Sequence, residues 1–106
     1  MYFGLSEEQK SLEDNIKKYL DDNASIEIIR SVVDGDLDKA NEIHRGLVDL
    51  GISSLMVPEE YGGLGLDMLF ATVVAGALGY GTAPCPYAGA YVMAPLALSI
   101  AGSDKQ

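Results

Sequence analysis

Near the middle of the chain the sequence reads Val57-Pro58-Glu59-Glu60-Tyr61-Gly62-Gly63-Leu64-Gly65-Leu66-Asp67. Three glycines within four positions permit backbone angles that residues with a Cβ avoid. Pro58 fixes its own φ and favours extended geometry at Val57. Asp67 stands where a helix N-cap belongs, immediately before a long apolar run. The residues by themselves therefore predict a tight connection between two helices.

Three helices are predicted before this connection. The first opens with the capping-box pattern of Ser6 and Gln9, and its apolar residues recur at helical spacing as far as about residues 22–24. Glycine ends each of the next two helices, which we expect at residues 26–33 and 37–50. The N-terminal half is therefore expected to be helical throughout.

Two further helices are predicted after the connection, at residues 68–80 and from about 86 to 101, and together they form a hairpin. Met68–Ser103 contains no Asp, Glu, Lys, Arg or His. Apolar residues go all the way round the helix at 68–80, so both of its faces should be covered. The connections between helices are expected near residues 23–25, 34–36, 51–66 and 81–86. Since Ile52–Val57 is the only extended candidate, the fold class is all-α with about five helices.

Composition limits the classes of function. The chain has 106 residues, enough for one domain, and a hydrophobic content of 48% that fits a folded chain. A net charge of −9 argues against nucleic acid as a partner. Cys85 is the lone cysteine, so it forms no intrachain disulfide and is typical of a small buried hydrophobe. No His/Cys cluster has metal-ligand spacing, and no metal site is expected.

A membrane hairpin is the main alternative for the uncharged segment. A spanning helix needs about 20 apolar residues, but the run is broken at Gly79–Pro86 into shorter pieces rich in Ala and Gly. We therefore expect a buried helical hairpin and no membrane span. The N-terminus lacks the basic start and apolar core of a secretory signal and is not rich in Arg and Ser like a transit peptide, which predicts a cytoplasmic location.

The residues by themselves provide little chemistry. Glu59 and Glu60 are adjacent, so on extended backbone they would point in opposite directions and form no catalytic pair. The glycines at 62–65 lack the strand, the spacing and the lysine of a phosphate loop. His44, the only histidine, is off the apolar stripe of its helix and is expected at the surface or an edge. We therefore expect no catalytic and no cofactor-binding residue in this chain.

The string from Pro58 to Asp67, preceded by Leu-Gly-Ile at Leu50–Ile52, resembles the N-terminal helical domain of the acyl-CoA dehydrogenases. The resemblance covers nearly the whole chain, as far as Ile100–Asp104. It implies that residues 1–106 are one domain, with the family's β-barrel and C-terminal helical-bundle domains absent from this chain. It also implies FAD bound mainly by those other domains, a glutamate base on the bundle, an acyl-CoA substrate, and an electron-transfer flavoprotein as electron acceptor.

The resemblance further implies that the start of the helix at 86–101 runs beside the far end of the acyl chain. The matching substrate-binding residues, which would share one face at helical spacing, are Tyr87, Ala90, Tyr91 and Ala94. Small residues would deepen a pocket and tyrosines would close it. The alternative is that the tyrosines simply pack in the hairpin, and the preferred acyl length stays open.

The function expected from the resemblance is α,β-dehydrogenation of an acyl-CoA thioester by a FAD-dependent enzyme, with this 106-residue chain inactive on its own. Another superfamily member, such as an acyl-CoA oxidase or a flavin monooxygenase, is one alternative. A non-catalytic helical interaction module is the other. Because large exposed apolar patches usually mark interfaces, the uncharged hairpin also predicts packing against further domains or a homo-oligomer.

Overall fold

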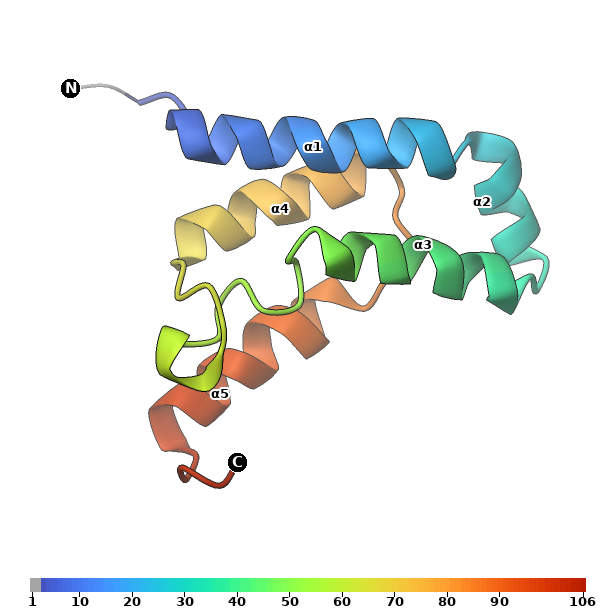
Figure 1. The fold of residues 1–106 in the computed structure, drawn as a ribbon. Coiled ribbons are helices and arrows are strands. Elements are labelled where there is room, and N and C mark those ends of the chain that lie inside the picture. Colours follow the sequence, from blue (N-terminus) through green and yellow to red (C-terminus); the bar gives the residue numbers. More distant parts are fainter. Residues whose placement is uncertain (1–2) are drawn as a thin grey trace.

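The computed structural model describes residues 3–106, and within that range every regular element is helical. The five α-helices are α1 (Glu7–Asn23), α2 (Ile26–Val33), α3 (Leu37–Asp49), α4 (Met68–Tyr80) and α5 (Ala94–Ala101) (Figure 1). A single 3-10 turn, η1 (Glu59–Tyr61), precedes α4, and a π-helical segment, η2 (Ala88–Met93), runs directly into α5. The all-α fold class with five helices is confirmed. The domain predicted over 1–106 also includes Met1 and Tyr2, which lie outside the described residues.

Side-chain caps fix where the α-helices begin. Ser6 accepts a hydrogen bond from the Gln9 N–H, and the Gln9 side chain accepts one from the Ser6 N–H, which completes the predicted capping box. Ser25 and Asp36 accept equivalent bonds at the starts of α2 and α3. Asp67 accepts from the third backbone N–H of α4 at 3.1 Å. Each cap satisfies a backbone donor that the helix itself leaves free, so these boundaries follow from short-range sequence.

One hydrophobic core lies between α1, α3, α4 and the connection that follows α3. α1 packs along α4 and also contacts α3. The largest fully buried side chains are Ile16, Leu20, Ile43, Leu47, Ile52, Leu55 and Val74. Tyr19 of α1 donates its hydroxyl to the carbonyl of Ile43 in α3 at 3.2 Å, and Gly46 leaves room for its ring. Of the described residues, none after Tyr87 is buried, although Tyr91 and Val92 pack partly buried against the core. The buried hairpin expected from the sequence is therefore wrong for its second helix, because η2 and α5 form an arm at the edge of the core (Figure 1).

The connection between α3 and α4 is a folded loop. Residues 52–57, the only extended candidate in the sequence, form a series of turns, in agreement with the connection expected at 51–66. The N–H groups of Leu64, Gly65 and Leu66 each donate to a carbonyl within residues 54–57 at 2.9 Å. These bonds bring the second half of the loop back onto the first half and leave Ile52 and Leu55 free to enter the core.

Glu59 and Glu60 do not lie on extended backbone, as the sequence suggested, but in the 3-10 turn η1. The carbonyl of Pro58 accepts from Tyr61 at 3.0 Å and from Gly63 at 3.1 Å, which closes the turn. Gly62 follows in the left-handed region at φ +84°, where a Cβ is unfavourable. Two hydrogen bonds to the carbonyl of Pro58 therefore hold Glu59 and Glu60 in the turn.

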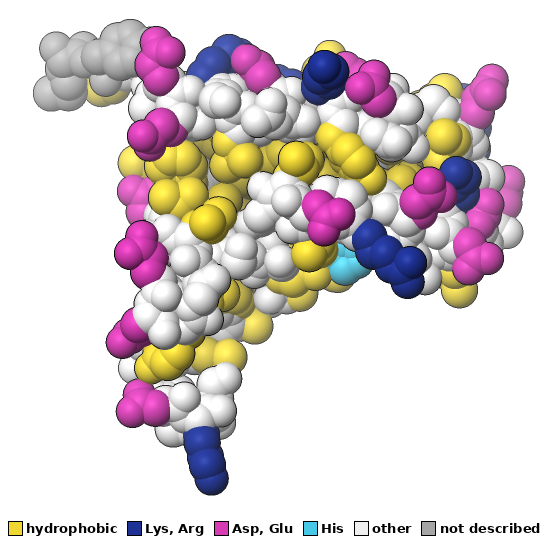
Figure 2. All heavy atoms as spheres, in the orientation of Figure 1, with side chains coloured by type: hydrophobic (Ala, Val, Ile, Leu, Met, Phe, Trp, Pro, Cys, Tyr) yellow, Lys and Arg dark blue, Asp and Glu magenta, His cyan; other side chains and the backbone are white. Residues whose placement is uncertain are grey.

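Only one face of α4 is covered within the described chain. α1 packs on that face, while Leu69 on the other remains 67% exposed and Met68 and Tyr80 are also exposed. Figure 2 shows hydrophobic side chains gathered below α1, on the side of the molecule where α4 lies. The complete cover expected for this helix is thus not supplied by residues 3–106.

No helix within residues 3–106 has the length and apolar character needed to cross a bilayer.

Candidate functional site

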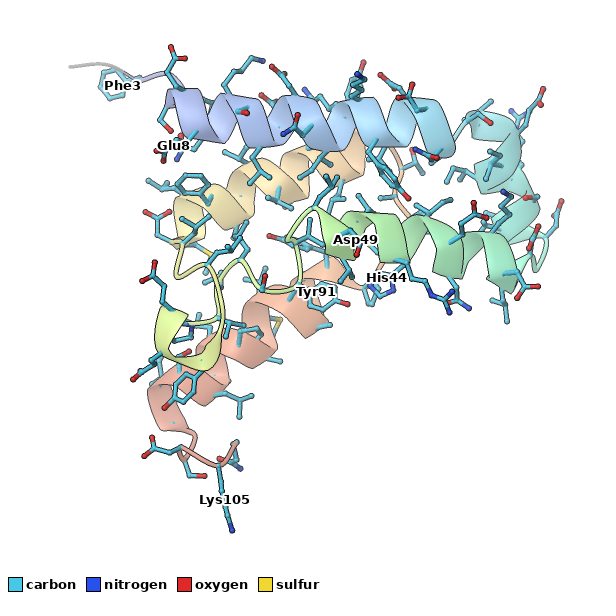
Figure 3. The ribbon with its side chains drawn as sticks, viewed as in Figure 1. Phe3, Glu8, His44, Asp49, Tyr91 and Lys105 are labelled. Atoms are coloured by element: carbon cyan, nitrogen blue, oxygen red, sulfur yellow. The ribbon has the colours of Figure 1, made fainter. Side chains whose placement is uncertain are left out.

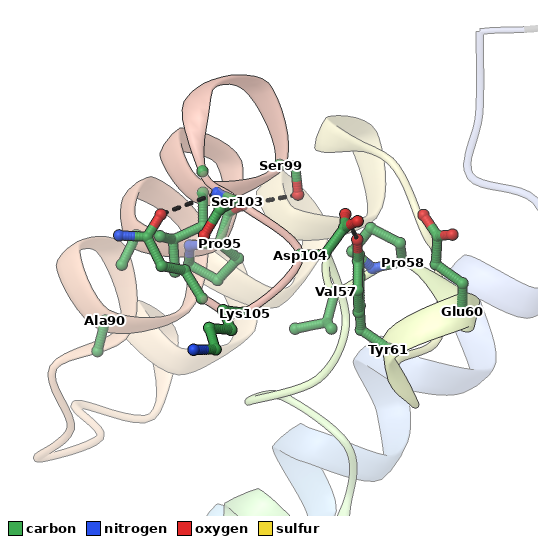
Figure 4. Close-up of a pocket in the computed structure, with 14 residues that line it drawn as sticks. Val57, Pro58, Glu60, Tyr61, Ala90, Pro95, Ser99, Ser103, Asp104 and Lys105 are labelled. Atoms are coloured by element: carbon green, nitrogen blue, oxygen red, sulfur yellow. Dashed lines mark hydrogen bonds between the residues drawn. The ribbon is translucent and has the colours of Figure 1, made fainter.

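A groove of about 500 Å³ lies between η1 and the arm made by η2 and α5 (Figure 4). Its lining includes Val57, Pro58 and Tyr61 from the connection and Ala90, Ala94 and Leu98 from the arm. The arm contributes small and apolar side chains, because that part of the sequence carries no charge. Charged residues also line the groove, namely Glu60 of η1 and Asp104 and Lys105 of the segment after α5.

A hydrogen bond joins two residues that line this groove. The Tyr61 hydroxyl donates to Asp104 Oδ1 at 3.0 Å, which joins η1 to the segment after α5 (Figure 4). The carboxylate of Asp104 raises the pKa of Tyr61, because it accepts a hydrogen bond that only the protonated phenol can donate. The nearby negative charge of Glu60 raises the same pKa further. Both side chains are exposed, so water competes for the bond and it contributes little to stability.

Tyr87, the first of the four predicted site residues, anchors the hairpin. Its side chain is 7% exposed, and its hydroxyl donates to the carbonyl of Ala71 in α4 at 3.2 Å. Burial, with a smaller contribution from Cys85, raises the pKa of Tyr87 to about 12. Cys85 itself is half-buried against the core rather than fully buried, and burial raises its pKa. Tyr87 therefore packs against α4 and the core, and this supports the alternative interpretation, in which the tyrosines have a packing role.

The raised pKa of Tyr87 predicts a stability change at alkaline pH. The phenol titrates near 10 in an unfolded chain and at about 12 in the folded one, so its contribution is complete below pH 10 and is lost as pH rises toward 12. Tyr87→Phe loses one hydrogen bond, which lowers the free energy of unfolding by about 0.5–1.5 kcal/mol at pH 7. Between pH 10 and 12 its stability should fall less steeply than that of the wild type. Urea unfolding of both proteins across this range is the measurement, and curves that stay parallel would contradict the assignment.

Tyr91 contacts α3 through the only histidine. Its hydroxyl lies 2.7 Å from His44 Nε2, and the two ring centroids are 5.8 Å apart with the planes tilted by 34° (Figure 3). Both side chains are half-buried. The edge position predicted for His44 is correct, but its partner could not be found by sequence reasoning, because the two residues are 47 positions apart and no pattern joins them.

The four predicted site residues do not share one environment. Tyr87 and Tyr91 face α4 and α3, whereas Ala90 and Ala94 are exposed and line the groove. The prediction assumed α-helical spacing, but Ala88–Met93 is π-helical. A π-helix bonds residue i to residue i+5, so each residue advances by a smaller angle than in an α-helix. The two tyrosines, four positions apart, therefore share one face, and the two alanines, also four positions apart, share another.

The arm side of the groove is suited to contact with an aliphatic group. Among the described residues no group of three His, Cys, Asp or Glu side chains could hold a metal ion. The wall formed by Ala90, Ala94 and Leu98 offers carbon atoms and no titratable group. This wall can therefore recognise an occupant only by its shape and by burying its apolar surface.

Comparisons with known proteins give two matches that cover most of the chain. Residues 6–106 match the family model described as "Acyl-CoA dehydrogenase, N-terminal domain". A curated relative, acyl-CoA dehydrogenase IpdE2 of Mycolicibacterium smegmatis, is 31% identical over 102 residues, which is 95% of this chain and 32% of the relative. The chain therefore spans about a third of the length of this curated relative. No solved structure matches the chain significantly.

Proposed function

The chain belongs to the acyl-CoA dehydrogenase family as an N-terminal domain, and from this premise we propose that its groove forms one wall of the acyl pocket of a FAD-dependent enzyme. The reaction proposed for the complete enzyme is α,β-dehydrogenation of an acyl-CoA thioester. The observation that carries the proposal is the uncharged wall of Ala90, Ala94 and Leu98 facing the loop that contains Pro58 and Tyr61.

The size of the groove and the apolar side chains of the arm support an aliphatic occupant. Ligand sites commonly measure about 300–1,000 Å³ and are lined mainly by apolar groups, and this groove, at about 500 Å³, lies in that range. Each methylene removed from water contributes about 0.8 kcal/mol. Alanines at positions 90 and 94 leave space that a larger side chain would fill, so the wall favours the hydrocarbon part of a substrate.

The net charge of this chain supports contact with the far end of the acyl group rather than with the coenzyme A end. The chain has 16 Asp and Glu against 7 Lys and Arg, for a net charge of −9. Coenzyme A carries several phosphate charges, which an acidic domain repels. The cationic contacts for the coenzyme are therefore assigned to other parts of the complete enzyme.

The described residues do not fit a flavin diphosphate. The glycine-rich loop is the only candidate, yet the N–H groups of residues 62–66 all donate to backbone carbonyls of residues 54–59. A phosphate site needs such donors free, and Glu59 and Glu60 beside them would repel an anion. We therefore assign FAD and the catalytic base to domains outside this chain, and activity to the complete enzyme alone. Transfer of electrons to an electron-transfer flavoprotein belongs to the same proposal and is supported by the family alone.

The exposed apolar surface supports packing against those domains. Leu69 of α4 is 67% exposed, and Met93 and Ile100 of the arm are 66% and 78% exposed. Large apolar surfaces that are open to water usually mark an interface. Further domains, or another subunit of a homo-oligomer, are the proposed cover for this surface.

A cross-linking experiment tests the proposal. An acyl-CoA with a diazirine on its terminal carbon should label the peptide that contains Ala90 and Ala94 when it is irradiated on the complete enzyme. The control is an acyl-CoA of the same length with the diazirine beside the thioester, which should label other peptides. Mass spectrometry locates both labels, and terminal labelling that is absent from residues 88–98 would contradict an acyl wall at the groove.

A further inference from the structure

We propose that His44 is a positioning residue: through Tyr91 it holds η2 in the π-helical register that directs Ala90 and Ala94 into the groove. The inference rests on the proposed function in one respect, since it makes His44 a determinant of the preferred acyl length. The structural part of the inference stands on the His44–Tyr91 contact itself and can be measured separately.

The contact has the geometry of a strong hydrogen bond. The distance of 2.7 Å between His44 Nε2 and Tyr91 Oη is at the short end of the range for nitrogen and oxygen partners. The rings also pack, with centroids 5.8 Å apart. A neutral imidazole can accept a hydrogen bond from the phenol O–H, and a protonated imidazole can donate one to the phenol oxygen. The contact can therefore form in either protonation state of the histidine.

His44 is attached to the rigid part of the molecule. Its neighbours on α3, Ile43 and Leu47, are buried in the core, and the Ile43 carbonyl accepts from Tyr19 of α1. The arm has less support, because no described residue after Tyr87 is buried and only Tyr91 and Val92 of the arm pack, partly buried, against the core. The fixed partner in the contact is thus α3, and η2 is the element whose position depends on the bond. Figure 3 shows the two side chains meeting between α3 and the arm.

The π-helical register needs such a support. π-Helices are rare, occur mostly as single turns and are frequent at functional sites. In η2 the N–H of Ala94 donates to the carbonyl of Gly89, five residues earlier. A return to α-helical bonding would advance each residue by a larger angle and rotate Ala90 and Ala94 relative to Tyr87, which is fixed to α4. The groove would then present a different wall to its occupant.

Four substitutions in the complete enzyme test the inference. His44→Ala and Tyr91→Phe remove the bond, while His44→Gln keeps a polar group that can donate or accept near the same place. Arg45→Ala, at the exposed next position on α3, is the matched control. Two quantities are measured for each variant: hydrogen exchange of the amides of residues 88–94, and kcat/KM across a series of acyl lengths.

The expected result is faster exchange at residues 88–94 in His44→Ala and Tyr91→Phe, by about three- to tenfold, the factor that one partly buried hydrogen bond supports. The acyl-length profile should change in the same two variants, His44→Gln should restore both quantities, and Arg45→Ala should alter neither. Unchanged exchange in both bond-deleting variants would overturn the role of His44 and leave the proposed function standing. Faster exchange with an unchanged profile would instead overturn the acyl wall, and with it the link between His44 and acyl length.

Discussion

Replacement of Gly63 by alanine is expected to lower the free energy of unfolding by more than about 2 kcal/mol, a large loss for a single added methyl group. A Cβ at this position would overlap the carbonyl group and the Cβ of Val57. The overlapped atoms are mainly backbone, and the Val57 carbonyl is held by the N–H of Gly65 at 2.9 Å. They cannot move aside without opening the loop that connects α3 to α4.

Gly76→Ala is the matched control for this substitution. Gly76 lies within α4, and a Cβ there would meet no atom within 4 Å. Alanine is favoured over glycine inside a helix by about 0.5–1 kcal/mol, so the same chemical change should stabilise the protein here. Urea unfolding of both variants, followed by circular dichroism, gives the two values. A Gly63→Ala protein within about 0.5 kcal/mol of the wild type, the range of an ordinary surface substitution, would show that the loop is not closely packed.

The helices could be predicted because their determinants are local. Ser6 and Asp67 cap α1 and α4 through bonds to residues three positions away, so the signal is contained in a short stretch. The same applies to the starts of α2 and α3, which Ser25 and Asp36 cap. What decides these boundaries is the free N–H groups of a first helical turn, and no distant contact is needed to satisfy them.

Local patterns were insufficient where a distant partner decides the conformation. The spacing of Tyr87, Ala90, Tyr91 and Ala94 indicated one helical face, but the segment is π-helical and Tyr91 contacts His44 on another helix. The turn η1 was likewise missed, because the backbone bonds that close it are not encoded in a side-chain pattern. Sequence reasoning proposed Tyr87, Ala90, Tyr91 and Ala94 together, and the structure was needed to show that only the two alanines line the groove.

The largest functional effect is expected from Ala94→Leu in the complete enzyme. Ala94 lines the groove, so a leucine there would occupy space that the proposal assigns to the end of the acyl chain. One methylene that gains or loses its place in an apolar pocket changes specificity by about 10- to 200-fold. Long-chain substrates should lose kcat/KM by a factor of this order, while short ones that do not reach Ala94 should keep theirs.

The direct test of the acyl wall is the ratio of kcat/KM for a long-chain to a short-chain acyl-CoA, measured in Ala94→Leu and in Ala97→Leu. Ala97 is exposed on the same helix and does not line the groove, so it controls for adding a leucine to α5. The acyl wall predicts a ratio that falls by about tenfold or more in Ala94→Leu and stays at the wild-type value in Ala97→Leu. Equal ratios in the wild type and both variants would contradict it.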